Sequence, residues 1–162
     1  MSALLRLSTI GLACALVSPA SAQLLARKDL SASVAMTIAQ TALETCTQQG
    51  YRVSVTVVGR TGEILVQIRG DNSNPHTMEN SMRKAYTSRT SGAPSGDMVK
   101  RLKDNPQLSQ IHLTNIIAAQ GALPIKVGND TIGAAGVSGA PGGEKDEACV
   151  KAGLDKVADH LK

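Results

Sequence analysis

The sequence predicts an α/β domain of the α+β kind, in which an antiparallel sheet of about five strands is flanked by helices. The first observation is an alternating, β-branched run at residues 52–58, which a Gly-Arg-Thr-Gly turn joins to a second such run, as in a hairpin. The second is a pair of amphipathic repeats, over residues 29–49 and from residue 145 onward, which are typical of helices. Helices at both ends of the chain can therefore cover an antiparallel sheet.

Helical patterns recur along the chain. The first helix ends before Gly50 and repeats apolar residues at every fourth position, namely Leu30, Val34, Ile38 and Ala42. A second is expected over residues 77–91, and the turn-rich connection after it contains a short helical turn at residues 98–103. The last begins near residue 145 and repeats Val150, Leu154, Val157 and Leu161.

Further short strands are expected between residue 116 and the last helix. They are the segments NIIAAQG, LPIKV and TIGAAGV. A Gly-Asn-Asp turn at residues 128–130 joins the last two, which favours antiparallel pairing. With the first hairpin, these segments complete the predicted sheet.

The start of the chain has the three-part design of a secretory signal peptide. Arg6 precedes an apolar run over residues 7–17, and a Ser-Ala step precedes Gln23. The apolar run is shorter than the about 20 residues that span a bilayer. We therefore expect residues 1–22 to be removed, and residues 23–162 to form a single domain, periplasmic or secreted, without a membrane span.

The charge of the expected domain is mild. The signal peptide contains one of the 17 Lys and Arg residues and none of the 13 Asp and Glu residues, so 16 basic and 13 acidic residues remain. The basic residues are scattered, and the chain has no Phe or Trp on which bases could stack. We therefore do not expect a nucleic-acid partner.

Two cysteines, Cys46 and Cys149, remain after removal of the signal peptide. In an oxidising compartment they could form one disulfide that ties the first helix to the last. Alternatively, they are two buried free thiols that behave as small apolar groups. Neither has a CxxC partner or a histidine at ligand spacing, so a structural zinc site is not expected.

A glycine-rich stretch from Gly133 leads into the last helix. The loop at residues 138–143 places backbone N–H groups before a helix N-terminus, where anions are favoured. Walker and dinucleotide fingerprints are both absent, so nucleotide binding is not predicted. Alternatively, the loop is a purely structural turn, since the carboxylates of Glu144, Asp146 and Glu147 can satisfy the helix dipole themselves.

His76 is the histidine that most suggests a ligand role. It enters a helix that carries Arg83 and Lys84 one to two turns later, and a neutral imidazole in such a place suits a metal or haem iron. Alternatively, His76 or Thr77 only caps that helix. The sequence has neither a recognisable Ser-His-Asp set nor an HExxH motif, so it indicates no enzyme class.

Three short runs stand out within residues 71–95 and 123–154: Lys-Ala-Tyr-Thr at residues 84–87, Leu-Pro-Ile at 123–125 and IGAAGVSGA at 132–140. Together with the opening helix and hairpin, the two stretches resemble the GlcG/HbpS-like haem-binding family, which includes the C-terminal domain of PduO-type proteins, and the three runs are the most specific parts of the match. The resemblance covers essentially the whole expected domain. It implies an antiparallel sheet flanked by helices and a symmetric homo-oligomer, often an octamer, with haem as the cofactor of some members.

The resemblance also implies where a ligand would bind. In such folds the glycine-rich corner faces the helix that bears Arg83, Lys84 and Tyr86, so cations and backbone donors can meet haem propionates together. The backbone donors would be those of the loop, namely Ser138, Gly139, Gly142 and Gly143.

The iron ligand differs among members of that family. One relative is thought to use a threonine at the Ala-Pro-Ser step, where this chain has Ser95. Another uses a histidine of its first helix, and this chain has none over residues 29–49. His76 is therefore our preferred iron ligand on chemical grounds.

These observations lead to three hypotheses. The first is a haem-binding protein, in haem or iron sensing, storage or breakdown. The second is an enzyme or binding module for a small carboxylate-bearing metabolite, with His76 as general base and the glycine loop as oxyanion site. The third is an oligomeric assembly subunit with a vestigial pocket.

Overall fold

The computed structural model describes residues 25–162, so the predicted signal peptide at residues 1–22 lies outside the described residues. The elements follow in the order α1 (Ala32–Gln48), β1 (Ser54–Val58), β2 (Ile64–Arg69), α2 (His76–Ser91), α3 (Gly96–Asp104), the 3-10 helix η1 (Ser109–His112), β3 (Ala122–Val127), β4 (Asp130–Ser138), α4 (Gly143–Lys156) and the 3-10 helix η2 (Ala158–Leu161). The predicted helices are confirmed with bounds shifted by at most three residues, except that the last predicted helix, expected to include Leu161, ends at Lys156 and is followed by η2.

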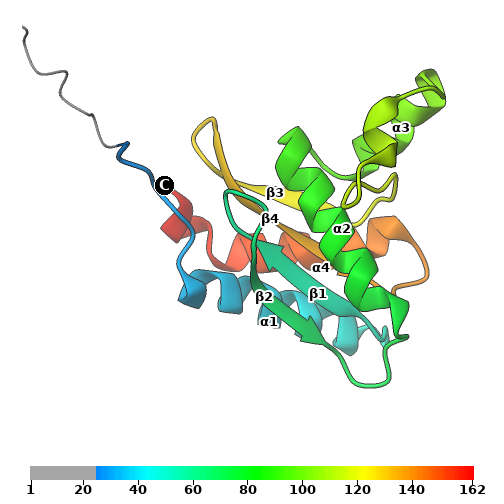
Figure 1. Cartoon of the computed structure of the whole chain (residues 1–162). Coiled ribbons are helices and arrows are strands. Elements are labelled where there is room, and N and C mark those ends of the chain that lie inside the picture. Colours follow the sequence, from blue (N-terminus) through cyan, green and yellow to red (C-terminus); the bar gives the residue numbers. More distant parts are fainter. Residues whose placement is uncertain (1–24) are drawn as a thin grey trace, which may run out of the picture.

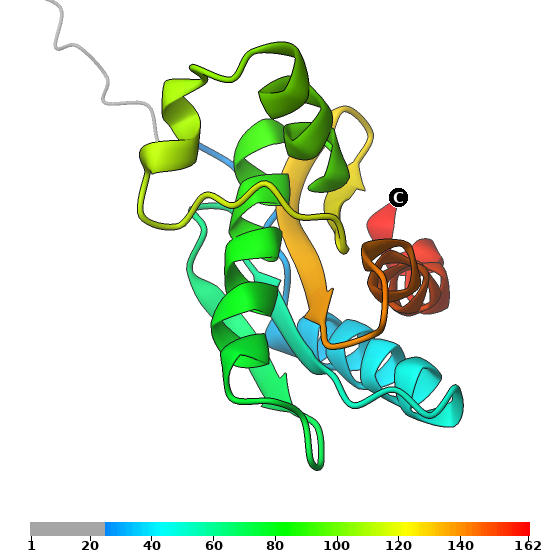
Figure 2. The same ribbon diagram turned by 90° about the vertical axis from the view of Figure 1, so that its right-hand side faces the viewer.

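The strands of the described chain form one antiparallel sheet in the order β2-β1-β4-β3. Helices α1 and α4 lie side by side on one face of this sheet, and α2 crosses the other face (Figures 1 and 2). The short helix α3 stands away from the sheet beyond the end of α2 (Figure 1). The predicted α+β architecture is therefore confirmed.

One predicted strand does not form. The described sheet has four strands, and the segment NIIAAQG, expected to be a strand, is irregular. Side chains of α2 pair with its backbone instead. Arg83 donates to the carbonyl oxygen of Ile116 at 2.9 Å, and Ile117 donates its N–H to the hydroxyl of Thr87 at 2.9 Å. Because these backbone groups already have partners, the segment needs no neighbouring strand.

The main hydrophobic core lies between the sheet and the α1/α4 pair. It contains Ile38 of α1, Val55 of β1, Val137 of β4 and Val150 of α4, all without solvent exposure. Helices α1 and α4 approach closely at Gly153, where a Cβ atom would lie 2.5 Å from the carbonyl oxygen of Ile38. Small residues thus let the two helices pack as a tight layer.

A disulfide joins the two helices of that layer. Cys46 of α1 and Cys149 of α4 are both fully buried, with their Cα atoms 5.6 Å apart. The bond links residues 103 positions apart in the sequence. Of the two alternatives for these cysteines, the disulfide is therefore confirmed.

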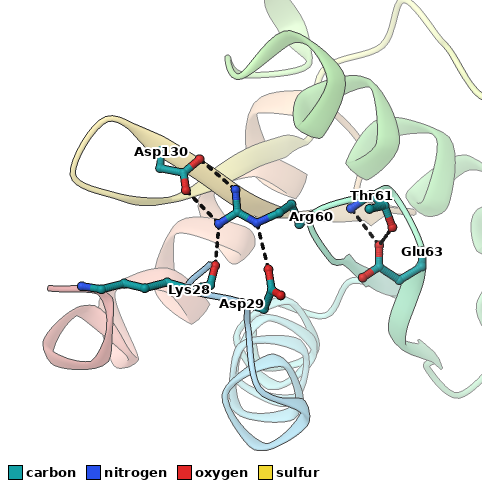
Figure 3. A network of polar contacts seen from close by, with 6 residues as sticks. All are labelled: Lys28, Asp29, Arg60, Thr61, Glu63 and Asp130. Carbon is teal, nitrogen blue, oxygen red and sulfur yellow. Dashed lines mark hydrogen bonds and ion pairs between the residues drawn. The ribbon is translucent and has the colours of Figure 1, made fainter. Parts of the chain in front are cut away.

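An arginine at the tip of the β1–β2 hairpin holds the segment before α1. Arg60 donates to both carboxylate oxygens of Asp130, the first residue of β4, at 2.9 and 2.8 Å, and to Asp29 at 2.8 Å (Figure 3). It also donates to the carbonyl oxygen of Lys28. The neighbouring Arg60 guanidinium holds the pKa of Asp130 below its usual value. These contacts fix the chain's approach to α1.

Candidate ligand pocket

A pocket of about 390 Å³ opens where the end of β4, the start of α4 and the first turns of α2 meet. Small-molecule sites span roughly 300 to 1,000 Å³, so this pocket is at the lower end of that range. Its lining consists of Asn74, His76, Asn80, Lys84, Ala119, Gln120, the loop Ser138, Gly139, Ala140, Pro141, Gly142 and Gly143, and Asp146. The lining is mainly polar.

Helix α2 supplies one wall of the pocket through residues four positions apart. His76, Asn80 and Lys84 share one face of the helix because four residues make slightly more than one turn. His76 is exposed at the first position of α2, Asn80 is half-buried, and Lys84 is buried. The wall therefore runs from an exposed imidazole at the rim to a buried ammonium group.

A buried ion pair closes the inner end of the pocket. The ammonium nitrogen of Lys84 lies 2.8 Å from Oδ2 of Asp146, and the two side chains are only 5% and 4% exposed. Lys84 also donates to the carbonyl oxygen of Val137 at 3.1 Å. Burial raises the pKa of Asp146, because loss of hydration outweighs the attraction of the Lys84 charge.

The glycine-rich loop forms the opposite wall. Gly142 is the N-cap residue of α4, and no side chain caps this helix end. The first N–H groups of the helix have no intrahelical acceptor, so they can serve as donors to an anion. Two contacts hold the loop in place: Asn80 donates to the hydroxyl of Ser138 at 3.0 Å, and Ala140 donates its N–H to Asp146 at 3.0 Å.

Most of the predicted site residues line this pocket. The structure brings together His76, Lys84 and the four predicted loop residues Ser138, Gly139, Gly142 and Gly143. The predicted grouping of α2 with the loop is therefore present in the fold.

Three predicted site residues lie elsewhere. Arg83 contacts the carbonyl oxygen of Ile116 and lies 3.5 Å from Glu79. The ring of Tyr86 packs against Gly62 in the β1–β2 turn. Ser95 is fully buried, and its hydroxyl accepts a hydrogen bond from the N–H of Ala122 at 3.0 Å. Successive helix positions are about 100° apart, so Arg83 and Tyr86 cannot share the direction of Lys84.

Five pocket residues were not predicted from the sequence: Asn74, Asn80, Ala119, Gln120 and Asp146. Asn80 could have been found, because it lies four residues after His76 and four before Lys84. Asp146 gave no such signal, because an acidic residue in the first turns of a helix is common for electrostatic reasons alone. Gln120 belongs to the segment that was expected to be a strand.

Metal-binding side-chain clusters and membrane-spanning helices are both absent from residues 25–162. No three His, Cys, Asp or Glu side chains of this part of the chain lie close enough together to hold a metal ion. None of its helices is long and apolar enough to cross a membrane.

The chain is similar to one protein family and to several solved structures. The model described as "Haem degrading protein HbpS-like" matches residues 30–155. The crystal structure of HbpS is 31% identical and superposes with a TM-score of 0.80, covering 87% of this chain and 99% of HbpS. A double mutant of HbpS from Streptomyces reticuli gives the same identity and TM-score, covering 90% of this chain and 98% of its own.

A more distant structure shares the fold. The PduOC:heme complex is 19% identical with a TM-score of 0.70, covering 78% of this chain and 93% of PduOC. No curated protein matches the chain. The family model covers most of the described residues, and HbpS is aligned over nearly its whole length, so this chain belongs to the HbpS-like family.

Proposed function

We propose that this protein binds haem in the pocket between α2 and the glycine-rich loop. The observation that carries the proposal is the arrangement of α2, which presents exposed His76 and buried Lys84 on one face, opposite the uncapped start of α4. Membership of the HbpS-like family supports haem as the ligand, as does the heme complex of the structurally similar PduOC. The role that follows is binding, in haem or iron sensing, storage or breakdown.

His76 is the proposed iron ligand. A porphyrin supplies four nitrogen ligands of its own, so a single protein side chain would be enough to hold the iron. A neutral imidazole is a common protein ligand of haem iron. His76 stands at the first position of α2 and is exposed at the rim, so its ring is accessible to a ligand. Bound haem would supply a redox-active iron centre at this place.

The inner end of the pocket fits the carboxylate edge of haem. Asn80, Lys84 and the first N–H groups of α4 are hydrogen-bond donors, and carboxylates accept from such groups. The apolar side chains of the lining are those of Ala119, Ala140 and Pro141. The two faces of a porphyrin need more apolar contact than these three residues give. A homo-oligomer, such as the octamer implied by the family resemblance, would provide that contact from a neighbouring subunit.

Location outside the cytoplasm is part of the proposal. The start of the sequence has the composition of a signal peptide, and the Cys46–Cys149 disulfide is of a kind that persists in oxidising compartments. Both features support a periplasmic or secreted protein. Detection of a mature N-terminus at Gln23 in protein recovered from the periplasm or medium would test this point directly.

The haem proposal is tested by titrating haemin into residues 23–162 and recording the Soret band. We expect a saturable shift for the wild-type protein and for His112→Ala, a control that changes an exposed histidine outside the pocket. His76→Ala should lose the shift or move the band. An unchanged spectrum for His76→Ala would exclude this residue as the iron ligand, and no saturation by the wild type would exclude haem.

A second candidate function is recognition of a small carboxylate-bearing metabolite, as an enzyme or a binding module. The modest volume and polar lining of the pocket favour it. Its test is thermal stabilisation and turnover of small organic acids by iron-free protein. If neither haemin nor any acid binds, the chain would be best described as an assembly subunit with a vestigial pocket.

A further inference from the structure

The Lys84–Asp146 pair occupies the place where an anionic ligand group would bind. Lys84 has three N–H donors, of which Asp146 and the carbonyl oxygen of Val137 accept one each. Both charged side chains also line the pocket. An incoming carboxylate would therefore meet the ammonium of Lys84 and the carboxylate of Asp146 together, and two carboxylates at one ammonium repel each other.

The same Asp146 carboxylate holds the glycine-rich loop. Its Oδ2 accepts from Lys84 at 2.8 Å, and its Oδ1 accepts from the N–H of Ala140 at 3.0 Å. One side chain thus bridges α2 and the loop between β4 and α4. Movement of Asp146 away from Lys84 would also remove the acceptor of the Ala140 N–H.

The surroundings of the pair leave little space for another arrangement. Gly121, with φ of 130°, packs against both side chains, and a Cβ atom there would lie 2.8 Å from Cβ of Asp146 and 2.8 Å from the Lys84 nitrogen. The N–H of Val137 donates to the carbonyl oxygen of Gly121 at 2.9 Å, which fixes this wall. The way out for Asp146 is therefore toward the pocket and the loop.

We propose that Asp146 is an internal carboxylate that occupies Lys84 in the ligand-free pocket, and that an anionic ligand group binds by displacing it and so releasing the glycine-rich loop. The ligand class is a carboxylate, whether a haem propionate or a small organic acid. Only the choice between a haem propionate and a small organic acid rests on the proposed function. Burial disfavours the charged form of Asp146, which makes its displacement easier.

The test is chemical rescue of the Asp146→Ala variant by acetate. This variant leaves Lys84 buried without its partner, so its melting temperature should fall. Acetate should restore most of the loss, because it supplies the missing carboxylate, whereas chloride at equal ionic strength should not. The double variant Lys84→Met/Asp146→Ala should show no acetate effect, and neither should Asp155→Ala, which breaks an exposed pair with Lys151 on the same helix.

A second measurement addresses displacement itself and begins with the wild-type protein, which keeps Asp146. In the wild-type protein, saturation with acetate should speed hydrogen exchange of the Ala140 amide, since its acceptor leaves. In Asp146→Asn, which keeps an oxygen acceptor, acetate affinity should rise by about tenfold, equal to about 1.4 kcal/mol. Absence of rescue, or an Ala140 amide that stays protected at saturation, would overturn the proposal.

The outcome is separable from that of the haem proposal. Rescue by acetate in a protein that does not bind haemin would uphold displacement and remove haem as the ligand. Haemin binding without rescue would uphold haem and show Asp146 to be a structural partner of Lys84 only.

Discussion

On one face of the sheet, α1 and α4 bury aliphatic side chains and a disulfide, whereas on the other face α2 buries hydroxyl groups and a charge. The buried residues of α1 are Ala35, Ile38, Ala39, Ala42 and Cys46, and those of α2 are Thr77, Ser81, Lys84, Ala85, Thr87 and Ser88. Burial of apolar surface stabilises a fold more than exchange of water for internal hydrogen bonds does. The α1/α4 face therefore supplies most of the stability, and α2 supplies one wall of the pocket.

The hydroxyl groups beneath α2 are paired with one another. Ser54 lies 2.8 Å from Thr77, and Thr56 lies 2.8 Å from Ser81, with these pairs joining β1 to α2. Each buried hydroxyl thus has a partner, so the face avoids the cost of unpaired polar groups. Such contacts also fix the position of α2 along the sheet, and hence the position of His76, Asn80 and Lys84 relative to the loop.

The largest effect is expected from loss of the disulfide on the α1/α4 face. Replacing both Cys46 and Cys149 with alanine should lower the free energy of unfolding by about 4 kcal/mol, because the bond closes a loop of about 100 residues in the unfolded chain. Urea unfolding followed by circular dichroism measures this. A loss below about 1 kcal/mol would show that packing alone holds this face together.

The next effect concerns the charge on the α2 face. Lys84→Met should cost about 3 kcal/mol, because it leaves the Asp146 carboxylate buried without its partner. The double variant Lys84→Met/Asp146→Asn should recover most of that loss in the same urea unfolding assay. Lys151→Met, which removes one partner of an exposed ion pair on α4, is the control and should change stability by less than about 0.5 kcal/mol. Equal losses for the two single variants would contradict the contrast between buried and exposed pairs.

Two glycines allow a direct comparison of helix packing on the two faces. In β4, a Cβ atom at Gly136 would lie 2.5 Å from the carbonyl oxygen of Ser81 in α2; in α4, one at Gly153 would lie 2.5 Å from that of Ile38. Alanine at either position should destabilise through overpacking, by about 2 kcal/mol at Gly136. The loss at Gly153 should be smaller, because alanine favours a helix by about 1 kcal/mol over glycine. If thermal unfolding shows a larger loss for Gly153→Ala than for Gly136→Ala, the α1/α4 layer accommodates an added methyl group less well than the contact between α2 and β4.

The smallest effect is expected for a single hydroxyl group under α2. Thr77→Val keeps the shape of the side chain but removes its hydrogen bonds with Ser54 and with the carbonyl oxygen of Asn74. The free energy of unfolding should fall by about 1 kcal/mol, because Ser54 keeps Ser73 as a neighbour at 3.3 Å. A loss as large as that of the disulfide would show that the hydroxyl pairs, and not the apolar face, dominate stability.

Local patterns in the sequence were sufficient for most of the secondary structure. Apolar spacing predicted the long helices, and the alternation of β-branched residues predicted the first hairpin, because both patterns reflect which side of one element is buried. The segment NIIAAQG has the residues of a strand but is irregular, since α2 side chains satisfy its backbone. That outcome depends on α2, because the two hydrogen bonds join residues that are 33 and 30 positions apart in the sequence.

The candidate site also has a part that could be predicted from the sequence and a part that could not. Residue types and helix boundaries are local properties, so the cations of α2 and the glycine-rich loop before α4 could be named as candidates from their residues alone. The folded structure was needed to show that Lys84 faces the loop while Arg83 and Tyr86 do not, because this depends on how α2 is rotated against the sheet. It also decided that Lys84 is paired with Asp146, 62 positions away, since a contact between distant residues exists only once both helices are packed against β4.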